Sequence, residues 1–252
     1  MNCVLSLNVG EKYQRVYKKC VATHKQYAEK WNYGYKLIDT MTIENVNINF
    51  LKYDGILKCF GEGYNWVLFV DADAIVNNMD IPLSYYTSEC HPEQDIILMM
   101  DMPLGIHIGL YGCLNGGVYI IRNTDWSRSF LRDLISIGKN IPDKNITDQD
   151  VLNHVVHENP RLINKFLVHQ WDRKHSINGY ISVNARTAHR DDFIIHFLSS
   201  SNDEALLDEY INLKNKNDIP TFIFHKNDYP LHWEKVRTMY PCLMDWPMYG
   251  FR

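Results

Sequence analysis

The stretch WVLFVDADAIVNN, residues 66–78, places an uninterrupted apolar run directly before two aspartates. A short apolar run such as Val67–Val70 predicts a strand that is buried in the core. Asp71 and Asp73 then stand where this strand ends. Two like charges at the end of a buried strand repel each other, so their presence there calls for a partner of opposite charge.

Strand-like and helix-like stretches alternate along the chain, and the order up to residue 70 is strand, helix, strand, helix, strand. This order predicts an α/β fold with a mainly parallel sheet flanked by helices, in which ligands bind at the carboxyl ends of the strands. The expected strands span residues 1–7, 35–38, 66–70, 96–100, 117–121 and 193–197. The expected helices span residues 13–31, 49–60, 127–137 and 148–157.

Length and composition indicate one globular domain, because 252 residues with 46% hydrophobic content can bury a large core. We expect a core over residues 1–200 and a C-terminal extension over residues 201–252 that packs on it. The net charge of −4, without a long basic run, argues against nucleic acid as a partner. The chain shows no CxxC pair, signal peptide or apolar stretch of membrane-spanning length, so we expect a soluble, cytoplasmic protein.

A divalent cation would relieve the repulsion between Asp71 and Asp73. Two carboxylates one residue apart, at a strand end where the backbone turns, can both supply oxygen ligands to one hard cation. The alternative is that they cap the following turn, and a bare DxD pattern occurs by chance roughly once in a chain of this length. The apolar run before the pair and Ala74–Val76 after it favour the metal site.

Four segments of the chain resemble nucleotide-sugar glycosyltransferases of the GT-A fold, especially the GT34 galactosyl/xylosyltransferase family, with features of the GT8 family. They are WVLFVDADAIVNN, LNGGVYIIRNTDWSRSFL at 114–131, DQDVLN at 148–153 and IIHF at 194–197. The resemblance implies a GT-A catalytic core over residues 1–200. It also implies a metal-dependent enzyme that transfers a sugar from a UDP-linked donor to a glycan acceptor with retention of anomeric configuration.

Carried over to this sequence, the resemblance implies a metal site of three protein ligands. Asp71 would contact both the nucleotide ribose and the metal, while Asp73 and His196 would ligate the metal. The alternative for His196 is a satisfied histidine in a buried strand. Carboxylate and imidazole ligands suit Mn²⁺, with Mg²⁺ as the other candidate, and the diphosphate would supply the remaining oxygens.

The resemblance also implies contacts with the donor sugar. Asn115, Gly116 and Gly117 would lie at the sugar, where glycines let the backbone approach a ligand closely. A bulge at the start of a strand is the alternative explanation for the glycines. Asp101, which follows the expected strand 96–100, is a candidate for binding a sugar hydroxyl, with a surface turn as its alternative.

The segment DQD supplies the catalytic candidates. In the resembling families the residues matching Asp148 and Gln149 face the donor sugar near its anomeric carbon. Asp148 is also the candidate for a carboxylate nucleophile, with Asp150 behind it. Thr147 and Asp150 also stand at capping-box spacing, a structural role that needs no substrate.

Three further residues are candidates for binding the nucleotide. Lys52, on the helix before the DxD strand, could contact the diphosphate, although lysines on helices are usually solvated. Asn8 and Tyr13 follow the first strand, where these enzymes hold the uracil base, and Tyr13 could stack on that base.

Two other functions fit parts of the pattern. Phosphohydrolases of the haloacid dehalogenase type also carry DxD after a strand, but their motif lies near the start of the chain, and Ile75 stands where they have Thr or Val. A non-catalytic carbohydrate-binding protein with the same fold is the other alternative. Unlike typical GT34 members, the sequence shows no N-terminal membrane anchor, so we expect a cytosolic enzyme of bacterial or viral glycan assembly.

Overall fold

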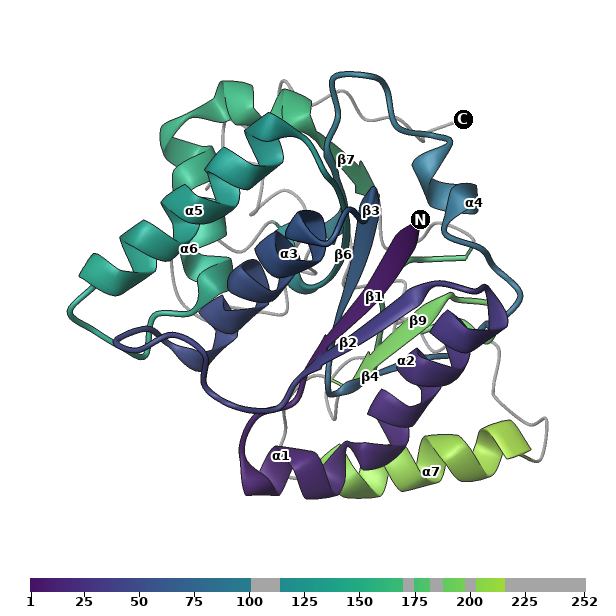
Figure 1. Ribbon diagram of the computed structural model, residues 1–252. Helices are drawn as coiled ribbons and strands as arrows, with labels where there is room; N and C mark the ends of the chain where they lie inside the picture. The colour runs from purple at the N-terminus through teal and green to yellow at the C-terminus, as the bar shows by residue number, and fades with distance from the viewer. Residues whose placement is uncertain (101–113, 170–174, 182–187, 198–202, 216–252) are drawn as a thin grey trace, which may run out of the picture.

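Figure 1 shows the computed structural model of the protein, which describes residues 1–100, 114–169, 175–181, 188–197 and 203–215. A six-stranded sheet has the order β2-β1-β3-β6-β5-β7, and a three-stranded sheet has the order β4-β9-β8. Within the main sheet β6 runs against the direction of the other strands. This mixed α/β architecture with a mostly parallel sheet confirms the predicted fold class.

The strands of the main sheet are β1 (Asn2–Leu7), β2 (Gly34–Ile38), β3 (Trp66–Asp71), β5 (Ile96–Met100), β6 (Leu114–Arg122) and β7 (Phe166–His169). The smaller sheet consists of β4 (Ala74–Val76), β8 (Gly179–Ile181) and β9 (Ile194–Phe197). The α-helices are α1 (Glu11–Val16), α2 (Lys18–Lys30), α3 (Leu51–Gly61), α4 (Ser84–Thr87), α5 (Asp125–Asn140), α6 (Asp148–Glu158) and α7 (Asp203–Asn215). Two short 3-10 helices are η1 (Ile48–Phe50) and η2 (Pro160–Lys165).

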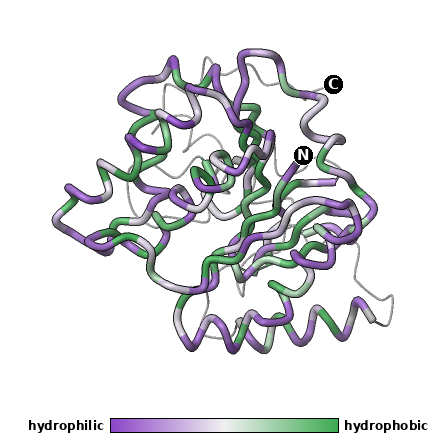
Figure 2. Tube along the Cα trace, viewed as in Figure 1, coloured by the Kyte–Doolittle hydropathy of each residue, from purple (hydrophilic) through white to green (hydrophobic). Residues whose placement is uncertain are grey.

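Both faces of the main sheet are covered, which explains its uninterrupted apolar strands. Successive side chains of a strand point to opposite faces. In β1, Cys3 and Leu5 pack in the cluster that includes residues of α3, α5 and α6, whereas Val4 packs in the cluster with α2 and the smaller sheet. The two layers are visible on either side of the sheet in Figure 1. Figure 2 shows the hydrophobic residues concentrated along the strands.

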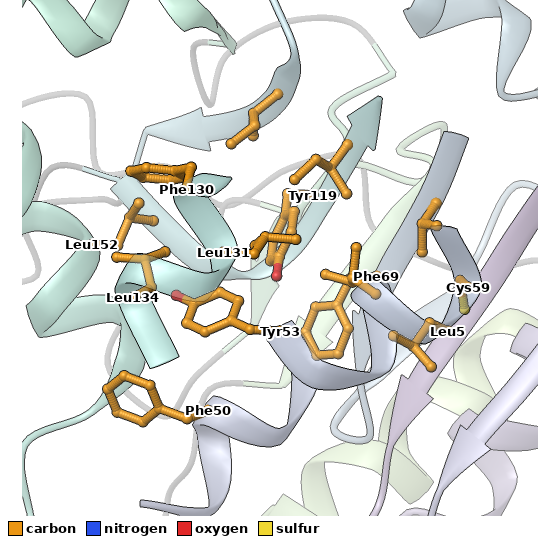
Figure 3. Packing of buried hydrophobic residues seen from close by; sticks show 14 of the residues in the cluster. Leu5, Phe50, Tyr53, Cys59, Phe69, Tyr119, Phe130, Leu131, Leu134 and Leu152 are labelled. Carbon is orange, nitrogen blue, oxygen red and sulfur yellow. The ribbon is translucent and has the colours of Figure 1, made fainter. Parts of the chain in front are cut away.

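A cluster of buried aliphatic and aromatic residues fills the space between the sheet and α3, α5 and α6 (Figure 3). Phe69 of β3 pairs with Tyr119 of β6, and their ring centroids are 5.3 Å apart. Tyr53 of α3 and Phe130 of α5 belong to the same cluster. The cluster packs α3 against the sheet, so that the first turn of α3 lies beside the end of β3 that carries the DxD motif.

Several element boundaries differ from those predicted. The helix expected over residues 13–31 is two helices, because Tyr17 departs from helical geometry with φ −98° and ψ 13°. The strand expected over 117–121 begins earlier, at Leu114, and runs antiparallel to β3. A buried strand has the same apolar pattern whether it is parallel or antiparallel to its neighbours, so the sequence could not reveal the direction of β6.

The turn that carries the DxD motif is held by a buried histidine of α2. Nε2 of His24 donates a hydrogen bond to the carbonyl of Ala74 at 2.7 Å, and Nδ1 lies 2.8 Å from the hydroxyl of Ser6. Because a carbonyl only accepts, Nε2 carries the proton of the neutral ring and Nδ1 accepts from Ser6. Burial lowers the pKa of His24 to about 4, although the Ala74 carbonyl and Asp73 oppose this shift.

We expect His24 to make the free energy of unfolding fall in mild acid. The histidine has a pKa of about 6.5 in the unfolded chain, so between pH 6.5 and 4 the unfolded state binds more protons than the folded state. Stability is therefore lost as the pH falls through this window, by about 2 kcal/mol at pH 5 for this residue. Urea unfolding at pH 7 and pH 5 measures the difference. His24→Gln should show a smaller loss between the two pH values, and an equal loss would contradict the assignment.

Helix α7, at the start of the predicted C-terminal extension, packs on the smaller sheet. Its buried residues Leu207 and Tyr210 belong to one cluster with Ile195 and Phe197 of β9. The hydroxyl of Tyr210 donates to Oδ1 of Asn77 at 2.6 Å. Residues 216–252 lie outside the described part of the chain. Within the described part, every helix is too short or too polar to cross a membrane.

Candidate functional site

The structure brings Asp71, Asp73 and His196 together at the carboxyl end of β3. Asp71 is the last residue of β3, Asp73 lies in the turn to β4, and His196 lies in β9, opposite Ala74. One ligand atom from each of the three side chains lies within 4.8 Å of the others. Nε2 of His196 is 3.0 Å from Oδ1 of Asp73. The antiparallel pairing of β4 with β9 therefore places a histidine from late in the chain beside the DxD motif.

The chemistry of this triad fits a divalent cation. Burial raises the pKa of Asp71 to about 7, Lys52 opposes this shift, and Asp73 adds to it. Burial and mutual repulsion disfavour the negative charges of Asp71 and Asp73. A bound cation would attract these charges and so favour the ionised carboxylates. Two carboxylates and one imidazole also form a donor set that suits Mn²⁺.

Gly117 keeps the space beside the triad clear. A Cβ atom at this position would lie 2.4 Å from Cε1 of His196 and 2.9 Å from Oδ2 of Asp71. Real Cβ atoms essentially never approach other atoms more closely than 3.0 Å, so a side chain here would displace two of the three candidate ligands. The triad therefore requires glycine at this point of β6.

A bulge in β6 brings the backbone of this glycine to the triad. Leu98 of β5 pairs with Tyr119, but Met100 pairs with Leu114, so β6 holds extra residues over this interval. The bulge thus falls on the segment from Asn115 to Gly117. The bulge expected as an alternative to a site role is present, and the bulge itself carries Gly117 to the triad.

Side chains hold the bulge in place. Oδ1 of Asn115 accepts a hydrogen bond from the backbone N–H of Gly117 at 2.8 Å. Oε1 of Gln149 accepts from the backbone N–H of Gly116, also at 2.8 Å. The bulged backbone groups that lose their strand partners are thereby satisfied by side chains of β6 and α6.

Lys52 lies buried between two carboxylates, with its side chain 2% exposed. Its Nζ atom is 3.1 Å from Oδ2 of Asp148 and 3.6 Å from Oδ1 of Asp71. It also donates to the carbonyl oxygen of Gly116 at 2.8 Å. Lys52 therefore links Asp71 of the candidate metal triad, the bulge and the first residue of α6.

Asp148 has two hydrogen-bond donors on one carboxylate oxygen. Lys52 contacts Oδ2, and the hydroxyl of Tyr53 donates to the same atom at 3.3 Å. Burial raises the pKa of Asp148, and Lys52 and Tyr53 act against this shift. Burial also lowers the pKa of Lys52, but Asp148 and Asp71 raise it by more, so the ammonium stays charged.

Asp150 takes part in a capping box at the start of α6. The backbone N–H and the hydroxyl of Thr147 both donate to Oδ2 of Asp150, at 2.9 and 2.7 Å. The backbone N–H of Asp150 in turn donates to the hydroxyl oxygen of Thr147 at 3.3 Å. Asp150 therefore has a structural role in capping α6. The same capping box fixes the first turn of the helix, which contains Asp148 and Gln149.

The nucleotide candidates lie around the end of β1. Asn8 follows Leu7, which pairs with Asp71, so Asn8 lies near the DxD turn. The amide oxygen of Asn8 is buried and has no hydrogen-bond partner within the described residues. Tyr13 lies on α1, 42% exposed, with its ring centroid 5.3 Å from that of Tyr17. Asp101 lies outside the residues that the structure describes.

Two residues that the sequence patterns did not reveal complete the buried part of the site. Tyr53 donates to Asp148, and Asn178 donates from its amide nitrogen to Oδ1 of Asn115 at 2.8 Å. Tyr53 follows Lys52 in an ordinary helical pattern, which gives it no distinguishing signal. Asn178 precedes the short strand β8, which the sequence analysis did not predict.

The fold and the acidic strand end define an α/β protein with a candidate metal site at the carboxyl end of β3. The model of the nucleotide-diphospho-sugar transferase family matches residues 11–205. The chain therefore belongs to the nucleotide-diphospho-sugar transferase family. This family membership argues against the alternative of a phosphohydrolase of the haloacid dehalogenase type, which is a different family.

Solved structures of glycosyltransferases are similar to this chain. One is a glycosyltransferase involved in the glycosylation of the major capsid of PBCV-1, with 19% identity, a TM-score of 0.63, and coverage of 84% of this chain and 98% of that chain. Mouse xyloside xylosyltransferase 1 has 10% identity, a TM-score of 0.47, and coverage of 79% and 98%. The first of these similarities supports the GT-A fold. No curated protein sequence matched the chain.

Proposed function

We propose that this protein is a metal-dependent glycosyltransferase that moves a sugar from a UDP-linked donor to a glycan acceptor. The observation that carries the proposal is the triad Asp71, Asp73 and His196 at the end of β3, kept clear by Gly117. When bound there, Mn²⁺ or Mg²⁺ would stabilise the negative charge that develops on the leaving diphosphate. The sites of α/β proteins form at such strand ends.

The buried oxygen of Asn8 supports uracil as the base. The N3–H group of uracil is a donor, and Asn8 offers an acceptor that has no other partner within the described residues. A buried acceptor gains most from a ligand that supplies the missing hydrogen bond. Tyr13, on the surface of α1, is proposed to stack on the base.

The first turn of α6 is proposed to face the donor sugar. Asp148 would stabilise the positive charge that builds at the anomeric carbon when the bond to the diphosphate breaks. Its Oδ2 atom is already engaged by Lys52 and Tyr53, which favours this fixed electrostatic role over attack as a nucleophile. Retention of configuration would then follow from attack by the acceptor on the face that the diphosphate leaves.

Lys52 is proposed to hold the site together rather than to reach out to the diphosphate. Its ammonium group is buried and engaged with Asp148, Asp71 and the carbonyl of Gly116. A charged group with these contacts compensates two carboxylates that burial would otherwise tend to neutralise.

Release of UDP from a panel of UDP-sugars tests the proposal. The purified protein is incubated with each sugar in the presence of Mn²⁺ or of a chelator, and free UDP is measured. We expect metal-dependent release from at least one donor, because water can take the place of the glycan acceptor when none is present. Release only from sugars of another nucleotide would overturn the assignment of uracil. No release from any nucleotide sugar would overturn catalysis and favour the carbohydrate-binding alternative.

A further inference from the structure

Asn178 is fully buried beside the bulge that carries the donor-site glycines. It lies directly before β8, and its side chain has 0% exposure. Its amide nitrogen donates to Oδ1 of Asn115 at 2.8 Å and lies 3.5 Å from the hydroxyl of Tyr180. Its amide oxygen has no hydrogen-bond partner within the described residues. Both described side-chain hydrogen bonds of Asn178 are thus made by its amide nitrogen.

The orientation of both amides follows from a backbone group. The backbone N–H of Gly117 donates to Asn115, so the atom of Asn115 at this contact must be its oxygen. That same oxygen is the partner of Asn178, so the atom of Asn178 at this contact must be its nitrogen. The unpartnered atom of Asn178 is therefore its oxygen, and the two assignments support each other.

This chain of hydrogen bonds leaves Asn115 with one free polar group. Its oxygen already accepts from Gly117 and Asn178, which uses the two acceptor sites of an amide oxygen. Its amide nitrogen has no hydrogen-bond partner within the described residues. Asn115 can therefore meet a ligand only as a hydrogen-bond donor.

We propose that Asn178 is a positioning residue that fixes Asn115 as a donor toward the sugar of the nucleotide-sugar substrate. The site then selects sugars that present an acceptor oxygen, such as that of a hydroxyl group, to the Asn115 amide. The inference rests on the proposed function, because Asn115 acts there on the donor sugar. It adds a residue from outside the four segments that resemble the family.

Asn178→Asp tests the role with almost no change of shape. The carboxylate cannot donate to Asn115 and repels its oxygen, which favours a rotated Asn115 amide. We expect kcat for hydrolysis of the UDP-sugar to fall on the order of 10²-fold, a size typical of lost oriented donors. The affinity for UDP with Mn²⁺ should stay within about twofold, because UDP lacks the donor sugar that Asn115 is proposed to contact. Asn140→Asp, the same change on the exposed surface of α5, should alter neither quantity.

Asn115→Asp provides a second, independent variant. Its carboxylate can still accept from Gly117 and Asn178, but it loses the free donor. We expect the same loss of kcat with the same affinity for UDP. Asn115→Asp combined with Asn178→Ser, which avoids two adjacent carboxylates, should be no worse than Asn115→Asp alone. The non-additive pattern is what a positioning role requires, whereas two separate structural roles would give losses that multiply.

The outcomes separate this inference from the proposed function. If the wild-type protein hydrolyses a UDP-sugar and Asn178→Asp does so at the same rate, the positioning role is wrong. If Asn178→Asp loses UDP affinity and thermal stability as strongly as hydrolysis, Asn178 is structural and the inference fails. If Asn178→Asp does not fold, Asn178→Ser takes its place and is combined with Asn115→Asp. Losses of kcat that multiply in this double variant would overturn the coupling, and losses that do not multiply would support it. If the wild-type protein neither binds UDP nor hydrolyses any UDP-sugar, the proposed function and this inference both fail.

Discussion

Replacement of Gly117 with alanine is expected to abolish metal-dependent binding of UDP. The added methyl group would lie 2.4 Å from Cε1 of His196 and 2.9 Å from Oδ2 of Asp71, so both side chains must move. Substitution of residues that contact metal ligands commonly lowers metal affinity about 10–100-fold, and Gly117→Ala displaces two candidate ligands at once. Isothermal titration of UDP in the presence of Mn²⁺ measures the loss.

Gly61→Ala is the matched control for this substitution. Gly61 is the last residue of α3, and an added Cβ there would have no neighbouring atom within 4 Å. This variant should bind UDP as the wild-type protein does, and thermal melting should show that both variants are folded. Wild-type affinity in a folded Gly117→Ala protein would mean that the triad does not hold the cation that binds UDP.

Lys52→Met is expected to cause the largest loss of stability among the substitutions considered. It removes the buried ammonium group and leaves Asp148 without its ion-pair partner. Breaking a buried ion pair from one side typically costs about 3–5 kcal/mol, because the remaining charge is desolvated and uncompensated. Urea unfolding at pH 7 measures the change in the free energy of unfolding.

Two further variants show whether this loss comes from the buried charge. Lys52→Met combined with Asp148→Asn removes both charges and should recover much of the stability lost in the single variant. Lys58→Met, on the same helix, removes an exposed lysine that lies 2.7 Å from Asp54 and should change stability by less than about 1 kcal/mol. A double variant less stable than Lys52→Met would contradict the account of this charge pair.

The sequence indicated the class of fold because its main signals are local. Val67–Val70 could be recognised as a buried strand from four adjacent residues, and the alternation of strands and helices indicated a mostly parallel sheet. The direction of β6 and its bulge could not be predicted, since they depend on which strands lie beside it. The same holds for the pairing of β4 with β9, which sets Ala74 opposite His196.

The candidate site was predictable where residues form a motif and hidden where they act through the tertiary structure. Asp71 and Asp73 are separated by one residue in the sequence, but His196 could be assigned only because its segment resembles a family segment. The partners of Lys52 come from β3, β6 and α6, so an ordinary helical lysine gave no sign of its burial. Asn178 lacks any local pattern, and only its contact with Asn115 draws attention to it.

Titration of UDP into the protein with and without Mn²⁺ tests the central claim most directly, namely that the triad holds a cation that in turn binds the nucleotide. The titration is repeated with Asp73→Ala and with Asp133→Ala, which removes an exposed aspartate of α5 as a control. We expect UDP to bind to the wild-type protein and to Asp133→Ala only when Mn²⁺ is present, and not to bind to Asp73→Ala. Equal binding with and without the metal, or unchanged binding to Asp73→Ala, would contradict the claim.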